Sequence, residues 1–231
     1  MLFILRAASI SMMLIAQTIA KLSQAGRQLA LPWCVFEVAL VQNQLASLSP
    51  AELGLVESWA THRQQEFATG RLCARRALEV LELTPADLLP DRDGVPTWPA
   101  GVAGSISHSR GVAMAVVARS ENCEILGLDI EKTNRLSETA IRKVVHPLEE
   151  SFVTGDQLKA SVVFSLKEAF YKAQFPRWRT TGNFHDLVLA VDLKAGTARV
   201  EEMDQRFASE LAELRFEFRL VDEYVVSLCW G

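Results

Sequence analysis

The sequence predicts an α+β protein with two lobes of similar size. Helical periodicity and short apolar strands occur in both halves of the chain, and each half offers enough of them for a small antiparallel sheet with helices. A length of 231 residues accommodates two such lobes. The halves show no convincing sequence repeat, so the lobes are expected to share an architecture without sharing a sequence.

Composition excludes several classes of protein. The hydrophobic fraction of 49% and the charged fraction of 23% are ordinary for a globular protein and exclude disorder. A net charge of -4 provides no general basic field, so nucleic acid is not an expected partner. The four cysteines are scattered without a CxxC pair, which is typical of reduced thiols in a cytoplasmic protein.

The first thirty residues form an apolar segment of uncertain role. Ala7–Ala20 carries no charge, but a stretch of 14 residues is too short to span a bilayer. We interpret it as a structural extension. A secretory signal cleaved near Ser23-Gln24-Ala25, or an association with a membrane, is the alternative.

Residues 31–124 are expected to form the first lobe. Cys34–Leu40 indicates a strand, and Glu52–Leu83 has the periodicity of one long helix. Asp91–Gly104 is dense in Gly and Pro and predicts a loop. Val112–Ala118 and Ile125–Ile130 indicate two buried strands, and their polar connection predicts a hairpin between them.

Residues 125–231 are expected to form the second lobe, with the site in the cleft between the two. Helices are predicted at Ser137–Val145 and Gln157–Gln174, separated by the helix breaker Pro147. Three further strands are predicted at Leu187–Leu193, Leu214–Leu220 and Tyr224–Trp230.

Three carboxylates and a lysine suggest a site for Mg²⁺ and a phosphate ester. Asp129 and Glu131 are two residues apart in a strand, so both project from one face. Glu168 and Lys172 are four apart and share a helix face. Each pair also has a plain alternative: a solvated turn for the acids, and an exposed salt bridge worth about 0.3–0.5 kcal/mol for the helical pair.

A hydroxyl-rich segment, Gly104–Ser109, follows the Gly/Pro loop. The hydroxyl of Ser107 and the imidazole of His108 are suitable partners for phosphate oxygens. A polar hairpin with a surface histidine is the alternative. A serine hydrolase is a poor interpretation, because the chain has no G-x-S-x-G sequence.

An arginine ridge runs along the first long helix. Arg63, Arg71 and Arg75 recur at multiples of four residues and flank the apolar stripe. A solvated basic face is the usual explanation. Guanidinium groups are nevertheless well shaped for phosphate, which suggests a nucleotide-like ligand with phosphates at both ends.

Taken in order, these motifs resemble the 4′-phosphopantetheinyl transferases. The motifs are R-x-x-E-F-x-x-G-R from Arg63, W-P at Trp98, G-S-I-S-H from Gly104, G-L-D-I-E from Gly127 and F-S-x-K-E-x-F-x-K from Phe164. The resemblance is to the pseudo-dimeric surfactin-synthetase type, most closely to enterobactin synthetase component D-like enzymes. It implies a monomer whose two lobes form the pseudo-dimer.

The resemblance also implies a reaction and a set of roles. The 4′-phosphopantetheine arm of coenzyme A would pass to a serine of an apo acyl or peptidyl carrier protein, releasing 3′,5′-ADP. The carriers would serve siderophore, nonribosomal peptide, polyketide or fatty-acid synthesis. Asp129, Glu131 and Glu168 would hold Mg²⁺, or Mn²⁺ in its place.

The remaining roles follow from the same motifs. Glu168 would accept the serine proton, and Lys172 would neutralise charge on the transferring phosphate. Ser107 and His108 would hold the pyrophosphate. Arg63 and Arg71 would bind the 3′-phosphate of coenzyme A, with Arg75 as a further helper.

One departure and two alternatives accompany this resemblance. Val95 stands before Pro96 where some relatives carry a basic residue, so that phosphate contact is either missing or replaced by Arg92. A Mg²⁺-dependent phosphohydrolase would use the same acids to activate water. A noncatalytic scaffold would have no evident need to retain all four charged residues of the site.

Overall fold

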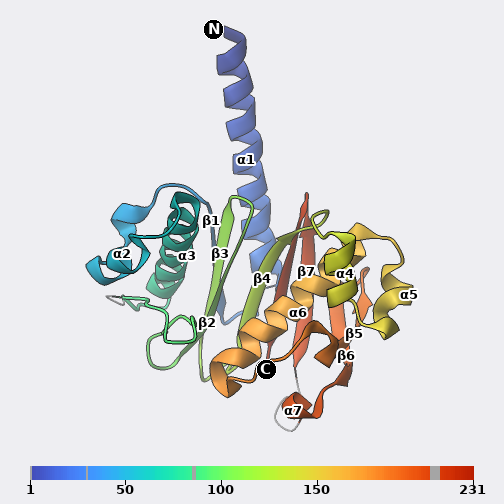
Figure 1. Ribbon diagram of the computed structural model, residues 1–231. Helices are drawn as coiled ribbons and strands as arrows, with labels where there is room; N and C mark the ends of the chain where they lie inside the picture. Colours follow the sequence, from blue (N-terminus) through green and yellow to red (C-terminus); the bar gives the residue numbers. More distant parts are fainter. Residues whose placement is uncertain (1, 30, 85–86, 209–213) are drawn as a thin grey trace.

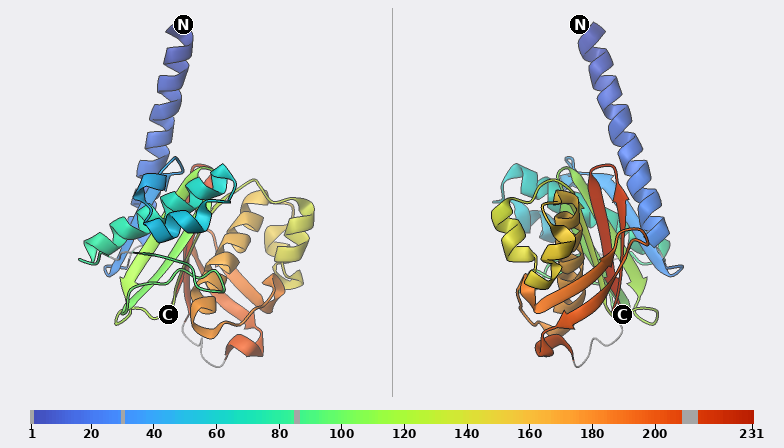
Figure 2. Two further views of the ribbon diagram at one scale, coloured as in Figure 1. Left: turned by 60° about the vertical axis from the view of Figure 1, so that its left-hand side comes forward. Right: turned by 90° about the vertical axis from the view of Figure 1, so that its right-hand side faces the viewer.

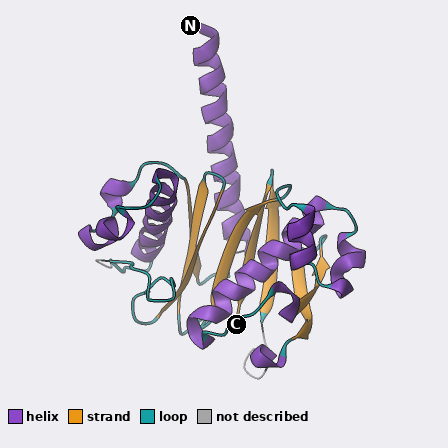
Figure 3. Cartoon of the chain, in the orientation of Figure 1, coloured by secondary structure: helices purple, strands orange, loops and turns teal. Residues whose placement is uncertain are grey.

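Two antiparallel sheets stand side by side, with helices on both faces (Figure 1). The computed structural model describes residues 2–29, 31–84, 87–208 and 214–231. One long helix on each sheet faces the same side of the molecule, and the first helix lies on the opposite side (Figure 3). This arrangement confirms the predicted α+β class with two lobes.

The first sheet has the strand order β1-β3-β2. Its strands are β1 (Cys34–Leu40), β2 (Val102–Ser109) and β3 (Val112–Arg119). Helix α3 (Thr61–Val80) packs on this sheet through a buried stripe that includes Ala74 and Leu78. A short 3-10 turn, η1 (Leu45–Ser47), and helix α2 (Pro50–Val56) precede α3.

The second sheet has the order β4-β8-β7-β6-β5. Its strands are β4 (Leu126–Lys132), β5 (Leu187–Asp192), β6 (Thr197–Met203), β7 (Arg215–Val221) and β8 (Tyr224–Trp230). Helix α6 (Gln157–Trp178) crosses this sheet, mainly over β4 and β8. The smaller elements are α4 (Glu138–Val144), η2 (Pro147–Glu149), α5 (Glu150–Val153), η3 (Phe184–Asp186) and α7 (Gln205–Ala208).

Serine hydroxyls join the two sheets where the edge strands β2 and β4 meet. The Oγ of Ser105 accepts a hydrogen bond from the backbone N–H of Leu128 at 3.0 Å. The Oγ of Ser107 accepts one from Ile130 at 3.3 Å. The serine oxygens therefore take the place of the carbonyl acceptors of a continuous sheet. They satisfy backbone N–H groups that are buried at this seam.

Helix α1 (Leu2–Leu29) packs on the sheets only through its C-terminal part. Leu22, Ala25 and Leu29 are buried in a core shared by both sheets, and the Lys21 ammonium pairs with Asp222 at 2.7 Å. The N-terminal half of α1 extends away from the sheets (Figure 2). Within the described ranges, no helix is both long and apolar enough to cross a membrane.

A buried lysine anchors the active-site helix to the second lobe. Lys167 of α6 is 0% exposed, and its Nζ donates to Glu149 at 2.7 Å and to two backbone carbonyl oxygens. Glu149 in turn accepts hydrogen bonds from the backbone of His146 and Leu189. Burial lowers the pKa of Lys167, and Glu149 opposes that effect. The pair therefore ties α6 to the loop before it and to strand β5.

Four details differ from the predictions. The predicted hairpin between Val112–Ala118 and Ile125–Ile130 is wrong, because β3 pairs with β1 and β2 while β4 pairs with β8. Gly104–Ser109, for which no strand was predicted, is part of strand β2. The single helix expected over Glu52–Leu83 is the two helices α2 and α3. Strand β6 was not predicted.

Candidate active site

A small hollow at the seam collects the predicted reaction-centre residues from both lobes. Its volume is about 260 Å³, and it is lined by Ile106, Ser107, His108, Asp129, Ile130, Glu131, Phe164, Glu168 and Lys172. Strand β2 supplies the hydroxyl and the imidazole, strand β4 two carboxylates, and helix α6 a carboxylate and an ammonium group. Segments far apart in sequence therefore meet at one point.

Helix α6 reaches this hollow because it lies very close to β4. A Cβ placed on Gly127 would lie 1.9 Å from the carbonyl oxygen of Ala169 and 2.5 Å from the backbone nitrogen of Ala173. Only glycine leaves room for the helix backbone at this point. The close approach brings Glu168 and Lys172 to the face of β4 that carries Asp129.

Lys172, Asp129 and Ser107 form one hydrogen-bonded network. The Nζ of Lys172 lies 2.6 Å from Asp129 Oδ1 and 2.9 Å from Ser107 Oγ. The hydroxyl of Ser107 donates to the same Asp129 Oδ1 at 2.9 Å. The network holds a positive charge at the junction of the lobes, where a phosphate would need it.

Two polar side chains hold Glu131. Its Oε1 accepts a hydrogen bond from Ser109 Oγ at 2.7 Å. The Arg135 guanidinium lies 3.3 Å from its carboxylate oxygens. We did not predict Arg135, which lies in the loop after β4, where a spacing of four residues carries no signal as it would on a helix.

Glu168 is suited to accept a proton. Burial raises the pKa of its carboxyl group, and the nearby charges of Asp129 and Glu131 raise it further, while Lys172 lowers it. A carboxylate whose pKa is raised is a stronger base than an ordinary glutamate. It lines the hollow beside Lys172.

The three acids provide the oxygen ligands that Mg²⁺ prefers. The Oδ2 atom of Asp129 is buried and has no hydrogen-bond partner in the described structure. Across the described ranges, however, no group of three or more His, Cys, Asp or Glu side chains is arranged to hold a metal ion. Lys172 and Arg135 pair instead with Asp129 and Glu131. The donor set therefore fits Mg²⁺ in chemistry, with two protein cations now beside the carboxylates.

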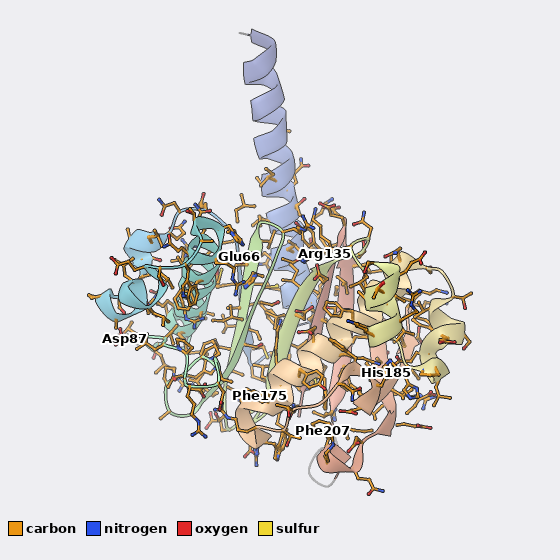
Figure 4. All side chains as sticks on the ribbon, in the orientation of Figure 1. Glu66, Asp87, Arg135, Phe175, His185 and Phe207 are labelled. Carbon is orange, nitrogen blue, oxygen red and sulfur yellow. The ribbon has the colours of Figure 1, made fainter. Side chains whose placement is uncertain are left out.

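A larger cavity of about 600 Å³ adjoins the hollow and shares Ile106, His108 and Lys172 with it. Its walls are mostly apolar and include Trp59, Phe67, Val95, Pro96, Tyr171, Phe175 and Pro176. Figure 4 shows Phe175 on α6, across from α3. Such walls suit the flat face of a base or another apolar group.

Two of the three predicted arginines line this cavity. Arg63 is half exposed, whereas Arg71 is 5% exposed, with its Nε donating to the Leu88 carbonyl at 2.5 Å. The Arg71 guanidinium carbon lies 4.2 Å from the centre of the Phe67 ring. Burial lowers the pKa of Arg71 to about 10, so it stays charged at neutral pH.

Arg75 is not among the residues that line the cavity. Its guanidinium pairs with the fully buried Glu52 and donates to the Ser47 carbonyl. These contacts give Arg75 a structural role, and we leave it out of the ligand set. Arg92 is also outside the lining, so it does not replace the basic residue absent at Val95.

A cluster of ion pairs that we did not predict joins the Gly/Pro loop to the end of α6. Arg179, at the C-terminus of α6, lies 2.6 Å from Asp91 and 3.0 Å from Asp93 in the Gly/Pro loop. Asp93, Gly94, Val95 and Pro96 of this loop line the cavity. The loop of the first lobe is thus tied to the active-site helix of the second.

The fold and this site define a class of protein: one of two lobes, with a charged site at their seam beside a cavity with apolar walls. Residues 51–118 match the 4′-phosphopantetheinyl transferase N-terminal domain, and residues 125–229 match the 4′-phosphopantetheinyl transferase superfamily.

Similar proteins include several transferases. The 4′-phosphopantetheinyl transferase Svp of Streptomyces mobaraensis is 37% identical over 174 residues, which is 71% of this chain and 71% of that protein. PptT of Mycobacterium tuberculosis is 34% identical, over 59% of this chain and 62% of its own length. Enterobactin synthase component D of Salmonella typhimurium is 31% identical, over 48% of both chains.

The chain belongs to the 4′-phosphopantetheinyl transferase superfamily. It is therefore an enzyme, a transferase of the 4′-phosphopantetheinyl group, as the motifs predicted.

Proposed function

We propose that the chain transfers the 4′-phosphopantetheine arm of coenzyme A to a serine of an apo carrier protein, with Mg²⁺ as the metal. The observation that carries this proposal is the network of Lys172, Asp129 and Ser107 beside a cavity of about 600 Å³. The network supplies charge for a diphosphate, and the cavity has the size and apolar walls for the adenosine end of coenzyme A.

The reaction exchanges one phosphorus–oxygen bond for another. The carrier serine Oγ attacks the phosphorus atom that bears the pantetheine arm. The bond to the adenosine-linked phosphate breaks, and 3′,5′-ADP leaves with the electron pair. We assign the serine proton to Glu168, directly or through water, because burial raises the pKa of that carboxyl group.

The cations of the site stabilise the transferring group. Lys172 would move from Asp129 to the phosphate and neutralise the charge that develops there, and Ser107 and His108 would hold the diphosphate. Arg63 and Arg71 would bind the 3′-phosphate, since both line the large cavity. These roles are proposals drawn from position and charge.

Asp129, Glu131 and Glu168 would hold Mg²⁺, or Mn²⁺ in its place, since all three line the small hollow. The buried Asp129 Oδ2 without a partner supports a cation there. When bound, the ion supplies positive charge to the diphosphate. Carboxylates held close together also repel one another, so a cation would relieve the cost of keeping all three ionised.

The carrier and the compartment are further proposals. Some relatives are named for enterobactin synthesis. We therefore expect the substrate to be a carrier protein of siderophore or secondary-metabolite synthesis. The four cysteines are free thiols, which supports a reducing compartment such as the cytoplasm. Because one chain supplies both walls of the hollow, a single copy would suffice as a monomer.

A mass measurement tests the transfer. The protein is incubated with coenzyme A, Mg²⁺ and a panel of apo carriers, and each carrier is weighed by mass spectrometry. A gain of one phosphopantetheine arm, lost in Asp129→Ala and with EDTA, is the expected result. Consumption of coenzyme A without a carrier mass gain would instead identify a phosphohydrolase and overturn the proposal.

A further inference from the structure

Arg63, Glu66 and His108 form a compact cluster in the wall of the large cavity. The Nη1 of Arg63 lies 2.9 Å from Glu66 Oε2 and 3.2 Å from His108 Nε2. The other ring nitrogen, Nδ1, lies 3.4 Å from Glu66 Oε1. Figure 4 shows Glu66 where α3 faces the three-stranded sheet. The roles discussed so far use the arginine and the histidine and leave the glutamate without one.

The donors and acceptors of this cluster determine the tautomer of His108. A guanidinium group can only donate hydrogen bonds, so the Nε2 atom that faces Arg63 must accept one. In a neutral ring the proton then sits on Nδ1, the nitrogen nearest the Glu66 carboxylate. At 3.4 Å this contact is longer than a strong hydrogen bond, and its attraction is mainly electrostatic.

We propose that Glu66 is a positioning residue for the diphosphate site: it holds the His108 ring by Nδ1, so that Nε2 meets a phosphate oxygen of the diphosphate. This inference rests on the proposed binding of coenzyme A. Phosphate oxygens only accept hydrogen bonds, so Nε2 must donate to them. For Nε2 to donate while Nδ1 keeps its proton, the ring must carry a positive charge.

The charges around His108 show why Glu66 matters. Burial lowers the pKa of His108, and Arg63 on α3 and Lys172 on α6 lower it further. Glu66 on α3 and Asp129 on β4 raise it. Glu66 contacts the ring directly, whereas Asp129 is paired with Lys172, so Glu66 is the carboxylate whose contact favours a charged ring. A histidine whose far nitrogen contacts a carboxylate is a common way to fix ring orientation.

The first test uses nitrogen NMR of the ligand-free protein, which contains four histidines. His108 is assigned by comparison with His108→Gln. We expect the wild type to carry the neutral-ring proton on Nδ1. Glu66→Met should lose this preference, because Glu66 contacts both Nδ1 and the Arg63 guanidinium that faces Nε2. Glu79→Met, at an exposed position of the same helix, is the matched control and should change nothing. An unchanged tautomer in Glu66→Met would overturn the proposal.

The second test separates binding from turnover in the carrier assay. Glu66→Met should raise KM for coenzyme A about tenfold with kcat within about twofold of the wild type. Glu66→Gln keeps an acceptor for Nδ1 without the charge. It should preserve the tautomer, and its KM for coenzyme A should lie between those of the wild type and Glu66→Met. It also serves if the Met variant fails to fold. A KM that is unchanged in Glu66→Gln and Glu66→Met would overturn the proposal.

A negative result in either test can be told apart from a failure of the proposed function. The tautomer is measured without coenzyme A or a carrier, so a wild type that transfers nothing can still show the dependence on Glu66. Conversely, a chain that modifies its carrier with a KM indifferent to Glu66 keeps the proposed function and loses this inference.

Discussion

The hydroxyl of Ser107 lies 2.9 Å from Asp129 Oδ1, so one hydrogen bond joins the two lobes at the reaction centre. The same hydroxyl accepts hydrogen bonds from the Ile130 backbone and from Lys172. Structural and chemical roles therefore coincide at this atom. Any change in the seam between the sheets is transmitted directly to the acid and the lysine that we assign to transfer.

Glu168→Gln should abolish transfer and stabilise the fold. Loss of the proton acceptor is expected to lower kcat about 100-fold to 10,000-fold. Burial raises the pKa of Glu168 above its ordinary 4.5, so the ionised group weakens the folded state at neutral pH. The neutral amide removes that cost, and each kcal/mol recovered would raise Tm by about 2–4 °C.

The sign of this effect can be checked against pH. Above the folded pKa of Glu168 the carboxylate is charged in both states, and the wild type carries the full penalty. Below the unfolded pKa it is neutral in both, and the difference disappears. We therefore expect Glu168→Gln to melt above the wild type at pH 8 in EDTA, and the gap to close toward pH 4. A lower Tm than the wild type at pH 8 would contradict this prediction.

Gly127→Ala should displace the active-site helix. The added Cβ would meet the backbone of α6 at 1.9 Å and 2.5 Å, and backbone atoms cannot move aside as a side chain does. We expect a stability loss of about 1–3 kcal/mol in urea unfolding. Transfer should fall about 100-fold, because Glu168 and Lys172 move relative to Asp129. Gly54→Ala is the control, since a Cβ there meets nothing within 4 Å.

Arg71→Ala should weaken the binding of coenzyme A more than the binding of its 3′-dephospho analogue. A lost charge-assisted hydrogen bond of about 1.5–3 kcal/mol predicts a 10-fold to 100-fold rise in KM for coenzyme A alone. The ratio of the two KM values is the measurement, because loss of the Leu88 contact affects both ligands. Arg75→Ala, whose partner is Glu52, should lower stability and leave the ratio unchanged. An unchanged ratio in Arg71→Ala would remove that residue from the 3′-phosphate site.

Lys167→Met should cost about 3–5 kcal/mol of unfolding free energy, because it leaves the buried Glu149 carboxylate without its cation. The double variant Lys167→Met/Glu149→Gln should recover part of that loss. Urea unfolding of the single variants and the double variant gives the coupling energy of the pair. Additive losses would show that the two groups do not depend on each other.

Local patterns predicted the parts of the site that depend on side-chain periodicity. Asp129 and Glu131 share a face because strand side chains alternate, and Glu168 and Lys172 share one because helix positions four apart are neighbours. Both pairs line the small hollow in the structure. Arg63 and Arg71 of the arginine ridge line the large cavity. These inferences needed only residues close together in sequence.

Distant partners explain the errors. Strand β4 pairs with β8, and no local signal opposed a hairpin with the nearer β3. The buried residues of β2 are serines whose partners lie on β4, so a hydrophobic pattern could not reveal a strand there. The pairing of Arg75 with Glu52 of another helix is likewise a contact that the ridge alone does not reveal. Each error concerns a contact that forms only in the assembled fold.

The pairing of β4 with β8 also bears on how the protein is made. Asp129 lies opposite Ser227, about 100 residues later in the chain. On the ribosome, the strand that carries two of the acids must therefore wait until nearly the whole second lobe has been synthesised. The first lobe can pair its three strands well before then. We expect the nascent enzyme to acquire its nucleotide-binding half first and its catalytic half last.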